Sequence, residues 1–100
     1  MMSGMGNVEG HFTPQFAALA HALGRAIADG EECGAAIAID IGGELVVDIW
    51  GGYADTARTR PWTADTIVNV WSSTKNITAL AALMLIDRGL IEAHTPVAQV

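Results

Sequence analysis

The sequence predicts an α/β (α+β) fold, in which an antiparallel sheet is flanked by helices and an all-helical region carries a Ser-x-x-Lys helix. Three observations lead to this fold: an amphipathic pattern over residues 13–29, an alternating pattern over residues 34–50, and a strongly apolar helix over residues 72–88. We expect the glycine-rich residues 1–12 to be a flexible terminus. Residues 13–100 are then the amino-terminal part of one domain.

The first helix is expected to begin at Thr13, because threonine is a favourable N-cap and Pro14 suits the first helical position. Asp29-Gly30 ends it, since glycine readily adopts the left-handed conformation that terminates helices. Between these signals, apolar residues recur at helical spacing: Phe16, Leu19, Ala20, Leu23, Ala26 and Ile27. One face of this helix should therefore cover an apolar surface.

That surface is expected to be a β-hairpin over residues 34–50. Gly42-Gly43 in its middle is typical of a two-residue turn with left-handed backbone. Residues on either side alternate in strand fashion, and the apolar positions are Ile37, Ile39 and Ile41, then Leu45, Val47 and Ile49. The stretch Tyr53 to Thr66 has turn residues but no period, and we expect an irregular surface connection there.

The helix over residues 72–88 follows the apolar run Ile67 to Trp71 and is itself apolar on nearly every side from Ile77 to Ile86. Gly89 provides its stop. A helix of this kind is buried on all faces in a folded protein.

This burial requires more chain than 100 residues supply. A single hairpin is marginally stable without further strands, and one amphipathic helix cannot cover both the hairpin and a second helix that is apolar all round. We therefore expect the chain to be the leading segment of a longer polypeptide, whose remainder beyond Val100 is its folding partner.

Ser72 and Lys75 have the spacing of a nucleophile and its base. A serine hydroxyl attacks a carbonyl only when a neighbouring base removes its proton, and residues three apart share one face of a helix. The start of a helix also offers unpaired N–H groups and partial positive charge to an oxyanion. Serine at a helix start is more often only an N-cap, but Lys75 is the only lysine in the chain, which favours the catalytic interpretation.

Composition excludes several other classes of function. The formal net charge of -6 and the lack of a basic cluster argue against partners such as nucleic acid or an anionic membrane surface. The longest apolar run is about half of what a bilayer requires, so we expect no membrane span. The first residues lack the basic start and apolar run of an export signal, and we expect a cytoplasmic protein.

Metal and cofactor sites are also not expected. Cys33 is the only cysteine, which excludes an internal disulfide and a cysteine-rich zinc site. His11, His21 and His94 have neither metal-ligand spacing nor the order of a Ser-His pair, and surface roles are favoured for them. Trp71, directly before Ser72, is a candidate substrate-binding residue, because tryptophan can line an acyl pocket.

Ser-x-x-Lys is a motif of penicillin-binding proteins and β-lactamases. The run from Thr66 to Lys75, with its continuation through residues 80–91 and Thr95-Pro96-Val97, resembles the amino-terminal portion of the serine β-lactamase-like superfamily, which has the penicillin-binding-protein fold. Within it, the sequence is most similar to the family VIII carboxylesterases. The resemblance implies a β-lactamase/transpeptidase-like fold and a catalytic domain that residues 13–100 begin.

The resemblance also implies that Ser72 forms an acyl-enzyme and that Lys75 takes part in proton transfer. The superfamily completes its site with a later tyrosine and a second oxyanion donor from a late strand, both expected outside these residues. Tyr53 precedes the nucleophile and is not that tyrosine. Trp71 departs from the small residue that many β-lactamases place before the serine, which counts against β-lactam hydrolysis.

Three functions follow as hypotheses. The first is a serine hydrolase, a carboxylesterase that cleaves a small-molecule ester through acyl-Ser72 with Lys75 as general base. The second is a β-lactamase or D-alanyl-D-alanine peptidase of the same fold. The third is a non-catalytic binding module in which the motif only caps a helix. No cofactor is expected for any of them.

Overall fold

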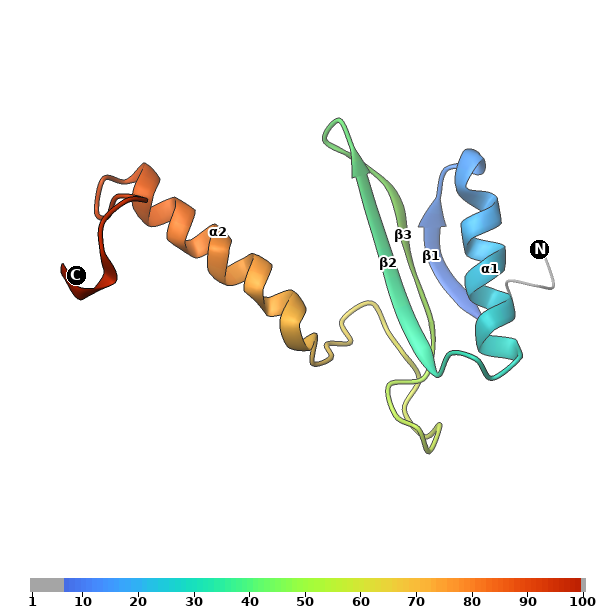
Figure 1. Cartoon of the computed structure of the whole chain (residues 1–100). Coiled ribbons are helices and arrows are strands. Elements are labelled where there is room, and N and C mark those ends of the chain that lie inside the picture. The colour runs from blue at the N-terminus through green and yellow to red at the C-terminus, as the bar shows by residue number, and fades with distance from the viewer. Residues whose placement is uncertain (1–6, 100) are drawn as a thin grey trace. The chain divides into compact units, whose positions relative to one another are not determined.

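The computed structural model describes residues 7–99, which belong to two compact units, Met1–Val68 and Asn69–Val100 (Figure 1). The first unit contains β1 (Val8–Phe12), a 3₁₀ turn (Pro14–Phe16), α1 (Ala17–Ala28), β2 (Gly34–Ile41) and β3 (Glu44–Gly52). The second contains a 3₁₀ turn (Trp71–Ser73), α2 (Thr74–Asp87) and a final 3₁₀ turn (Val97–Gln99).

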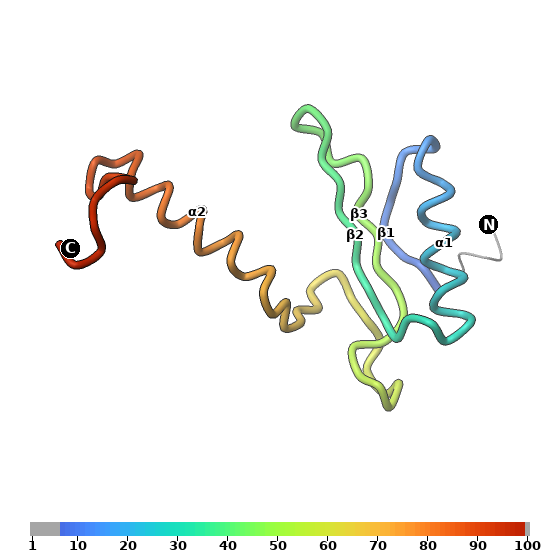
Figure 2. The backbone as a smooth tube through the Cα atoms, in the orientation of Figure 1, coloured from blue at the N-terminus to red at the C-terminus, as the bar shows by residue number. Residues whose placement is uncertain are grey.

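The first unit is a three-stranded antiparallel sheet with the strand order β1-β3-β2 (Figure 2). Ile49 of the central strand β3 pairs with Gly10 on one side and with Ile37 on the other. The β2–β3 hairpin turns at Gly42 (φ 62°) and Gly43 (φ 86°), the positive values that a type I′ turn needs at both positions. The Gly43 N–H donates to Asp40 Oδ1 at 3.0 Å, which stabilises the turn.

Residues 8–12 differ from the sequence expectation, because they form strand β1 and not a flexible terminus. Gly10 explains the close pairing: its φ is 101°, and a Cβ added there would lie 2.0 Å from the Asp48 carbonyl oxygen. Gly10 suggests flexibility in the sequence, but in the structure its lack of a side chain lets β3 lie close to β1. Residues 1–6 of the expected flexible terminus lie outside the described residues.

One apolar layer joins α1 to the sheet. Its buried side chains are Ala20, Leu23 and Ile27 from the helix and Val46, Val47 and Ile49 from β3. Complete burial of a valine, leucine or isoleucine side chain stabilises a fold by about 1.5–3 kcal/mol. The amphipathic stripe in the sequence is therefore the face of α1 that covers β3.

Leu45 departs from the expected alternation. The register shifts between Ile39 and Asp40, where Ile39 pairs with Val47 but Asp40 pairs with Leu45. This bulge inserts Val46 as an extra residue, so Val46 is 5% exposed and Leu45 is 43% exposed.

Thr13 also departs from its expected role. It lies at the N-cap position of the 3₁₀ turn, but its hydroxyl makes no capping hydrogen bond and is buried without a partner. Its backbone N–H donates to the Val46 carbonyl at 2.9 Å. Thr13 thus links the start of the helical segment to the central strand through its main chain.

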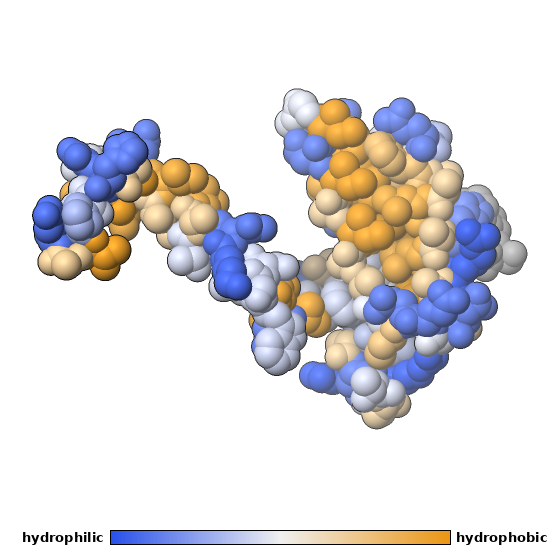
Figure 3. Space-filling view, in the orientation of Figure 1, coloured by the Kyte–Doolittle hydropathy of each residue, from blue (hydrophilic) through white to orange (hydrophobic). Residues whose placement is uncertain are grey.

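The hairpin carries apolar side chains on its surface, as the space-filling view shows (Figure 3). Ile41 and Leu45, on either side of the turn, are among the exposed large apolar residues. β2 is an edge strand among the described residues. An apolar edge strand is a suitable place for further strands to join a sheet.

The second unit is built on α2, which ends at Asp87, and Gly89 (φ 75°) follows its C-cap residue Arg88. The N–H groups of Gly89 and Leu90 donate to the carbonyls of Ile86 and Leu85, each at 3.0 Å. Several large apolar side chains of α2 are exposed: Ile77, Leu80, Leu83, Met84 and Leu85. Neither α2 nor any other helix of the described residues has the length and apolar character that crossing a bilayer requires.

Candidate active site

Ser72 and Lys75 lie one turn apart at the start of the second unit. Ser72 belongs to the 3₁₀ turn Trp71–Ser73, and Lys75 to the first turn of α2. Lys75 Nζ lies 3.5 Å from Ser72 Oγ, at the long end of hydrogen-bond range, and both side chains are exposed. Contacts between catalytic groups are often this long before substrate binds. The two groups that the sequence selects are thus within reach of one another, and their catalytic roles stay a prediction.

Capping does not account for this pair. The N-cap residue of α2 is Ser73, and its side chain makes no capping hydrogen bond. The Ser72 hydroxyl is instead the acceptor of the Lys75 contact. The first N–H groups of α2 remain without an intrahelical partner, as at the start of any helix, and can stabilise negative charge nearby.

Trp71 has a left-handed backbone with a φ of 52°. This conformation costs a non-glycine residue about 1–2 kcal/mol, so something must hold it. The Trp71 N–H donates to Asn69 Oδ1 at 2.9 Å, and the Ser73 N–H donates to the Val70 carbonyl at 3.1 Å. These two hydrogen bonds fix the backbone on either side of Ser72.

Asn69 is a residue that the sequence analysis missed. Asparagine often accepts a hydrogen bond from the N–H two residues later, and the order Asn69-Val70-Trp71 offers this arrangement. The left-handed conformation of a tryptophan, by contrast, has no signal in its residue type.

Trp71 is 79% exposed, and its role as a substrate-binding residue stays a prediction. Trp50 and Trp62, the other two tryptophans, belong to the first unit, where Trp50 Nε1 donates to Glu9 Oε2 at 3.2 Å. Within residues 7–99, the His, Cys, Asp and Glu side chains form no group of three or more suited to a metal ion.

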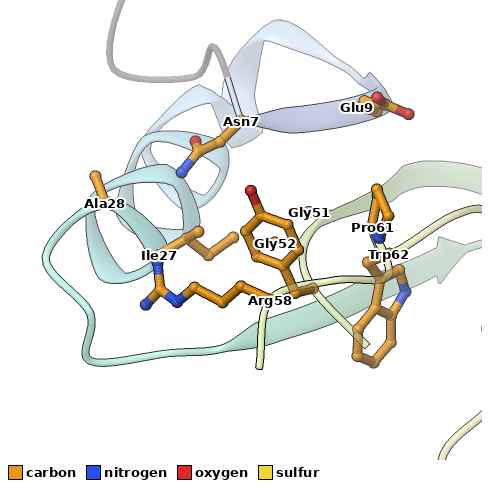
Figure 4. A pocket seen from close by; sticks show the side chains of 10 residues that line it. Asn7, Glu9, Ile27, Ala28, Gly51, Gly52, Arg58, Pro61 and Trp62 are labelled. Atoms are coloured by element: carbon orange, nitrogen blue, oxygen red, sulfur yellow. The ribbon is translucent and has the colours of Figure 1, made fainter. Parts of the chain in front are cut away.

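The first unit contains a cavity of about 370 Å³ (Figure 4). The Arg58 guanidinium lies 5.8 Å from the centre of the Tyr53 ring, within cation–π range. Asn7 Nδ2 donates to the Gly24 carbonyl at 3.1 Å and joins the start of β1 to α1. The cavity is lined by the start of β1, the ends of α1 and β3, and the connection after β3. Its lining residues are Asn7, Glu9, Ile27, Ala28, Gly51, Gly52, Tyr53, Arg58, Pro61 and Trp62.

Asp55 organises the connection after β3, which showed no motif in the sequence. Its carboxylate accepts hydrogen bonds from the Thr59 hydroxyl and from the backbone N–H groups of Thr59 and Arg60, the last two at 3.0 Å. The Thr59 hydroxyl and then the Arg60 N–H lower the pKa of Asp55 from its ordinary value. An isolated antiparallel β-bridge between Tyr53 and Pro61 closes the same loop.

Comparison with known proteins gives consistent matches. The profile of the Beta-lactamase family matches residues 19–100. The Esterase/beta-lactamase LipL of Mycobacterium tuberculosis is 40% identical over 92 residues, which are 92% of this chain and 21% of that protein.

Two solved structures resemble the chain. The crystal structure of a family VIII carboxylesterase superposes with a TM-score of 0.84 at 41% identity, covering 92% of this chain and 25% of that one. A novel penicillin-binding protein homolog from Caulobacter crescentus superposes with a TM-score of 0.76 at 40% identity, covering 83% and 22%. The chain thus spans about a quarter or less of the length of these relatives.

Proposed function

Because the chain belongs to the beta-lactamase family, we propose that it carries the nucleophile of a serine hydrolase that cleaves carboxylic esters through an acyl-Ser72 intermediate. The observation that supports this proposal is the 3.5 Å separation of Lys75 Nζ and Ser72 Oγ at the start of α2. The matches to a family VIII carboxylesterase and to a protein named esterase/beta-lactamase support the ester as substrate class.

In the proposed reaction, Lys75 Nζ acts as the general base and accepts the hydroxyl proton as Ser72 Oγ attacks the ester carbonyl carbon. The carbonyl oxygen becomes an oxyanion, and N–H groups at the start of α2 stabilise it. The carbon–oxygen bond to the alcohol then breaks, and the alkoxide leaves with the proton that Nζ carries. Water attacks the acyl-Ser72 carbonyl in the second half, with Lys75 again as the base, and releases the acid and the free serine.

The remainder of the polypeptide is the proposed partner of this segment. With Ser72 and Lys75 alone, only the N–H groups at the start of α2 stabilise the oxyanion. No acid other than Lys75 itself is then at hand to protonate the leaving alcohol. The exposed apolar side chains of α2 and the small share of the relatives that the chain covers both support a longer protein. We place the second oxyanion donor and a proton-transferring tyrosine in that remainder.

A second candidate function is hydrolysis of β-lactams or of D-alanyl peptides. The structural likeness to a penicillin-binding protein homolog favours it. Trp71 counts against it, because the resemblance implies a small residue before the serine in many β-lactamases and this chain has a tryptophan there.

The deciding experiment measures kcat/KM of the complete enzyme for a chromogenic acetate ester and for a chromogenic cephalosporin. A preference for the ester supports the esterase, and a preference for the cephalosporin supports the second candidate. Covalent labelling with a fluorophosphonate, followed by mass spectrometry, should locate the label on Ser72. Ser72→Ala should abolish both turnover and labelling, whereas the matched control Ser73→Ala should keep most of each. Turnover that survives in Ser72→Ala would refute the assignment of the nucleophile.

A further inference from the structure

β1 has an unpaired edge among the residues that the structure describes. In the strand order β1-β3-β2, β1 pairs with β3 on one side and with no described strand on the other (Figure 1). Gly10 in the middle of β1 is exposed, and the pairing with β3 continues through Gly10 without a shift of register. β1 is therefore a continuous edge strand, and such a strand can pair with another through its backbone N–H and C=O groups.

The sequence of β1 is complementary to itself in the antiparallel direction. Val8-Glu9-Gly10-His11-Phe12 reads apolar, acidic, glycine, basic, apolar. When two such strands pair about a twofold axis at Gly10, each Glu9 lies opposite His11 of the other copy, and each Val8 lies opposite Phe12. A carboxylate opposite an imidazole is a favourable cross-strand pair. A slip of two residues would place Glu9 opposite Glu9, or His11 opposite His11, so the charges specify one register.

The two faces of β1 suit such a pairing. Val8 and Phe12 are half-buried and pack against the core under α1, so pairing of two copies extends this apolar layer. Glu9 and His11 are exposed and, by the alternation of a strand, share the opposite face. Glu9 Oε2 accepts the Trp50 Nε1–H at 3.2 Å, which leaves Oε1 for an imidazole of the other copy.

The position of α1 also permits the pairing. α1 packs against β1 and β3 together. In a sheet that continues from one copy into the next, the two α1 helices then lie about two strand spacings apart, about 10 Å, which is a normal distance between packed helices.

We propose that the edge of β1 binds a second copy of this chain, with the two β1 strands antiparallel about Gly10 so that the two sheets become one. The opposite edge, β2 (Gly34–Ile41), lacks this self-complementarity, because Asp40 is its only charged residue. The inference is independent of the proposed function, since it assigns no role to Ser72 or Lys75. Two strands of five residues form a small interface, so we expect a dimer that dissociates on dilution.

Two single substitutions in the complete enzyme test this register. Glu9→Lys places a positive side chain opposite His11 of the second copy, and His11→Glu places two carboxylates opposite one another. Each change occurs twice in a twofold dimer, so we expect each variant to raise the dissociation constant of the dimer by about 10-fold or more. Mixed in equal amounts, the two variants should form a heterodimer, because a basic β1 then faces an acidic one.

Sedimentation velocity over a range of concentrations, with a fluorescent label on one variant of the mixture, gives the measurement. Glu44→Lys is the matched control: it makes the same change of charge at an exposed residue of the hairpin and should leave the dimer unchanged. Melting temperatures identify variants that do not fold. In that case the double variant Glu9→Cys/His11→Cys provides the test, because oxidation should link position 9 of one copy to position 11 of the other.

A dimer that both substitutions weaken, and that the mixture restores, would establish this interface. A complete enzyme that stays monomeric up to about 100 μM would overturn the proposal and would indicate that further chain covers β1. A dimer that neither substitution weakens, or a mixture without heterodimer, would also overturn it.

Discussion

Lys75 Nζ approaches Ser72 Oγ from one turn further along the helix, at 3.5 Å. The contact is local, because it depends on the spacing of two residues within one turn at the start of α2. Such a contact can serve either proton transfer or simple attraction between a cation and a polar group, and substitution of the lysine distinguishes the two.

Lys75→Arg should be almost as inactive as Lys75→Ala. Guanidinium remains protonated at any working pH and cannot accept the Ser72 proton, although it preserves the positive charge. Removal of a general base lowers rates by about 100- to 10,000-fold, and we expect kcat to fall in this range for both variants. Steady-state ester hydrolysis by the complete enzyme provides the measurement. Substantial activity in Lys75→Arg would show that the residue supplies charge and not basicity.

Ile49→Ala should strongly destabilise the complete protein. Ile49 is 1% exposed between α1 and the centre of the sheet, so truncation leaves a cavity that costs about 2–5 kcal/mol in free energy of unfolding. Ile41→Ala is the matched control, because Ile41 is 54% exposed at the end of the hairpin. Urea unfolding followed by tryptophan fluorescence measures both. Equal losses would indicate that further chain covers Ile41 as completely as α1 covers Ile49.

Asp55→Asn should weaken the loop after β3 in a manner that depends on pH. Hydrogen bonds from Thr59 and Arg60 lower the pKa of Asp55, so the folded protein prefers the carboxylate. The resulting stabilisation is fully present above the unfolded pKa, about 3.9, and is lost as the pH falls through the lower folded value. The stability difference between wild type and Asp55→Asn should therefore be largest near neutral pH and shrink below about pH 4.

The matched control for this comparison is Asp65→Asn, which removes an exposed carboxylate from the same connection. Urea midpoints at several pH values between 3 and 7 give the measurement. A difference for Asp55→Asn that grows towards low pH would contradict the assigned direction of its pKa.

The features that the sequence predicts here are those with local causes. Gly42-Gly43 specifies its turn through backbone freedom, and Ser72 and Lys75 meet because helical geometry joins residues three apart. The family resemblance read from the Ser-x-x-Lys region agrees with the profile match over residues 19–100. The sequence was informative for these short segments, each of which determines its own conformation.

The features that the sequence did not predict depend on distant or subtle partners. β1 forms because Gly10 fits against Asp48, some forty residues away, and no local pattern encodes that contact. The bulge at Val46 shifts the register between β2 and β3, and the alternation of apolar residues alone does not specify where such a shift occurs. The left-handed backbone of Trp71 is accompanied by a hydrogen bond that its N–H donates to Asn69 Oδ1, and the residue type of a tryptophan gives no warning of that conformation.

Residues 1–100 expressed alone should be aggregated or molten, and inactive towards a chromogenic acetate ester. The second unit exposes apolar side chains along α2, among them Ile77 at 65%, Leu80 at 54% and Leu83 at 59%. A helix with this surface lacks the burial that offsets the entropy of folding. The hairpin adds an apolar edge strand, which promotes association between copies. Supplying the remaining chain should restore a cooperative melt and serine-dependent turnover together, as measured by differential scanning calorimetry and ester hydrolysis. A monodisperse segment that melts cooperatively and hydrolyses the ester through Ser72 would show that these residues need no further chain, and would remove the proposed role of the remainder in completing the site.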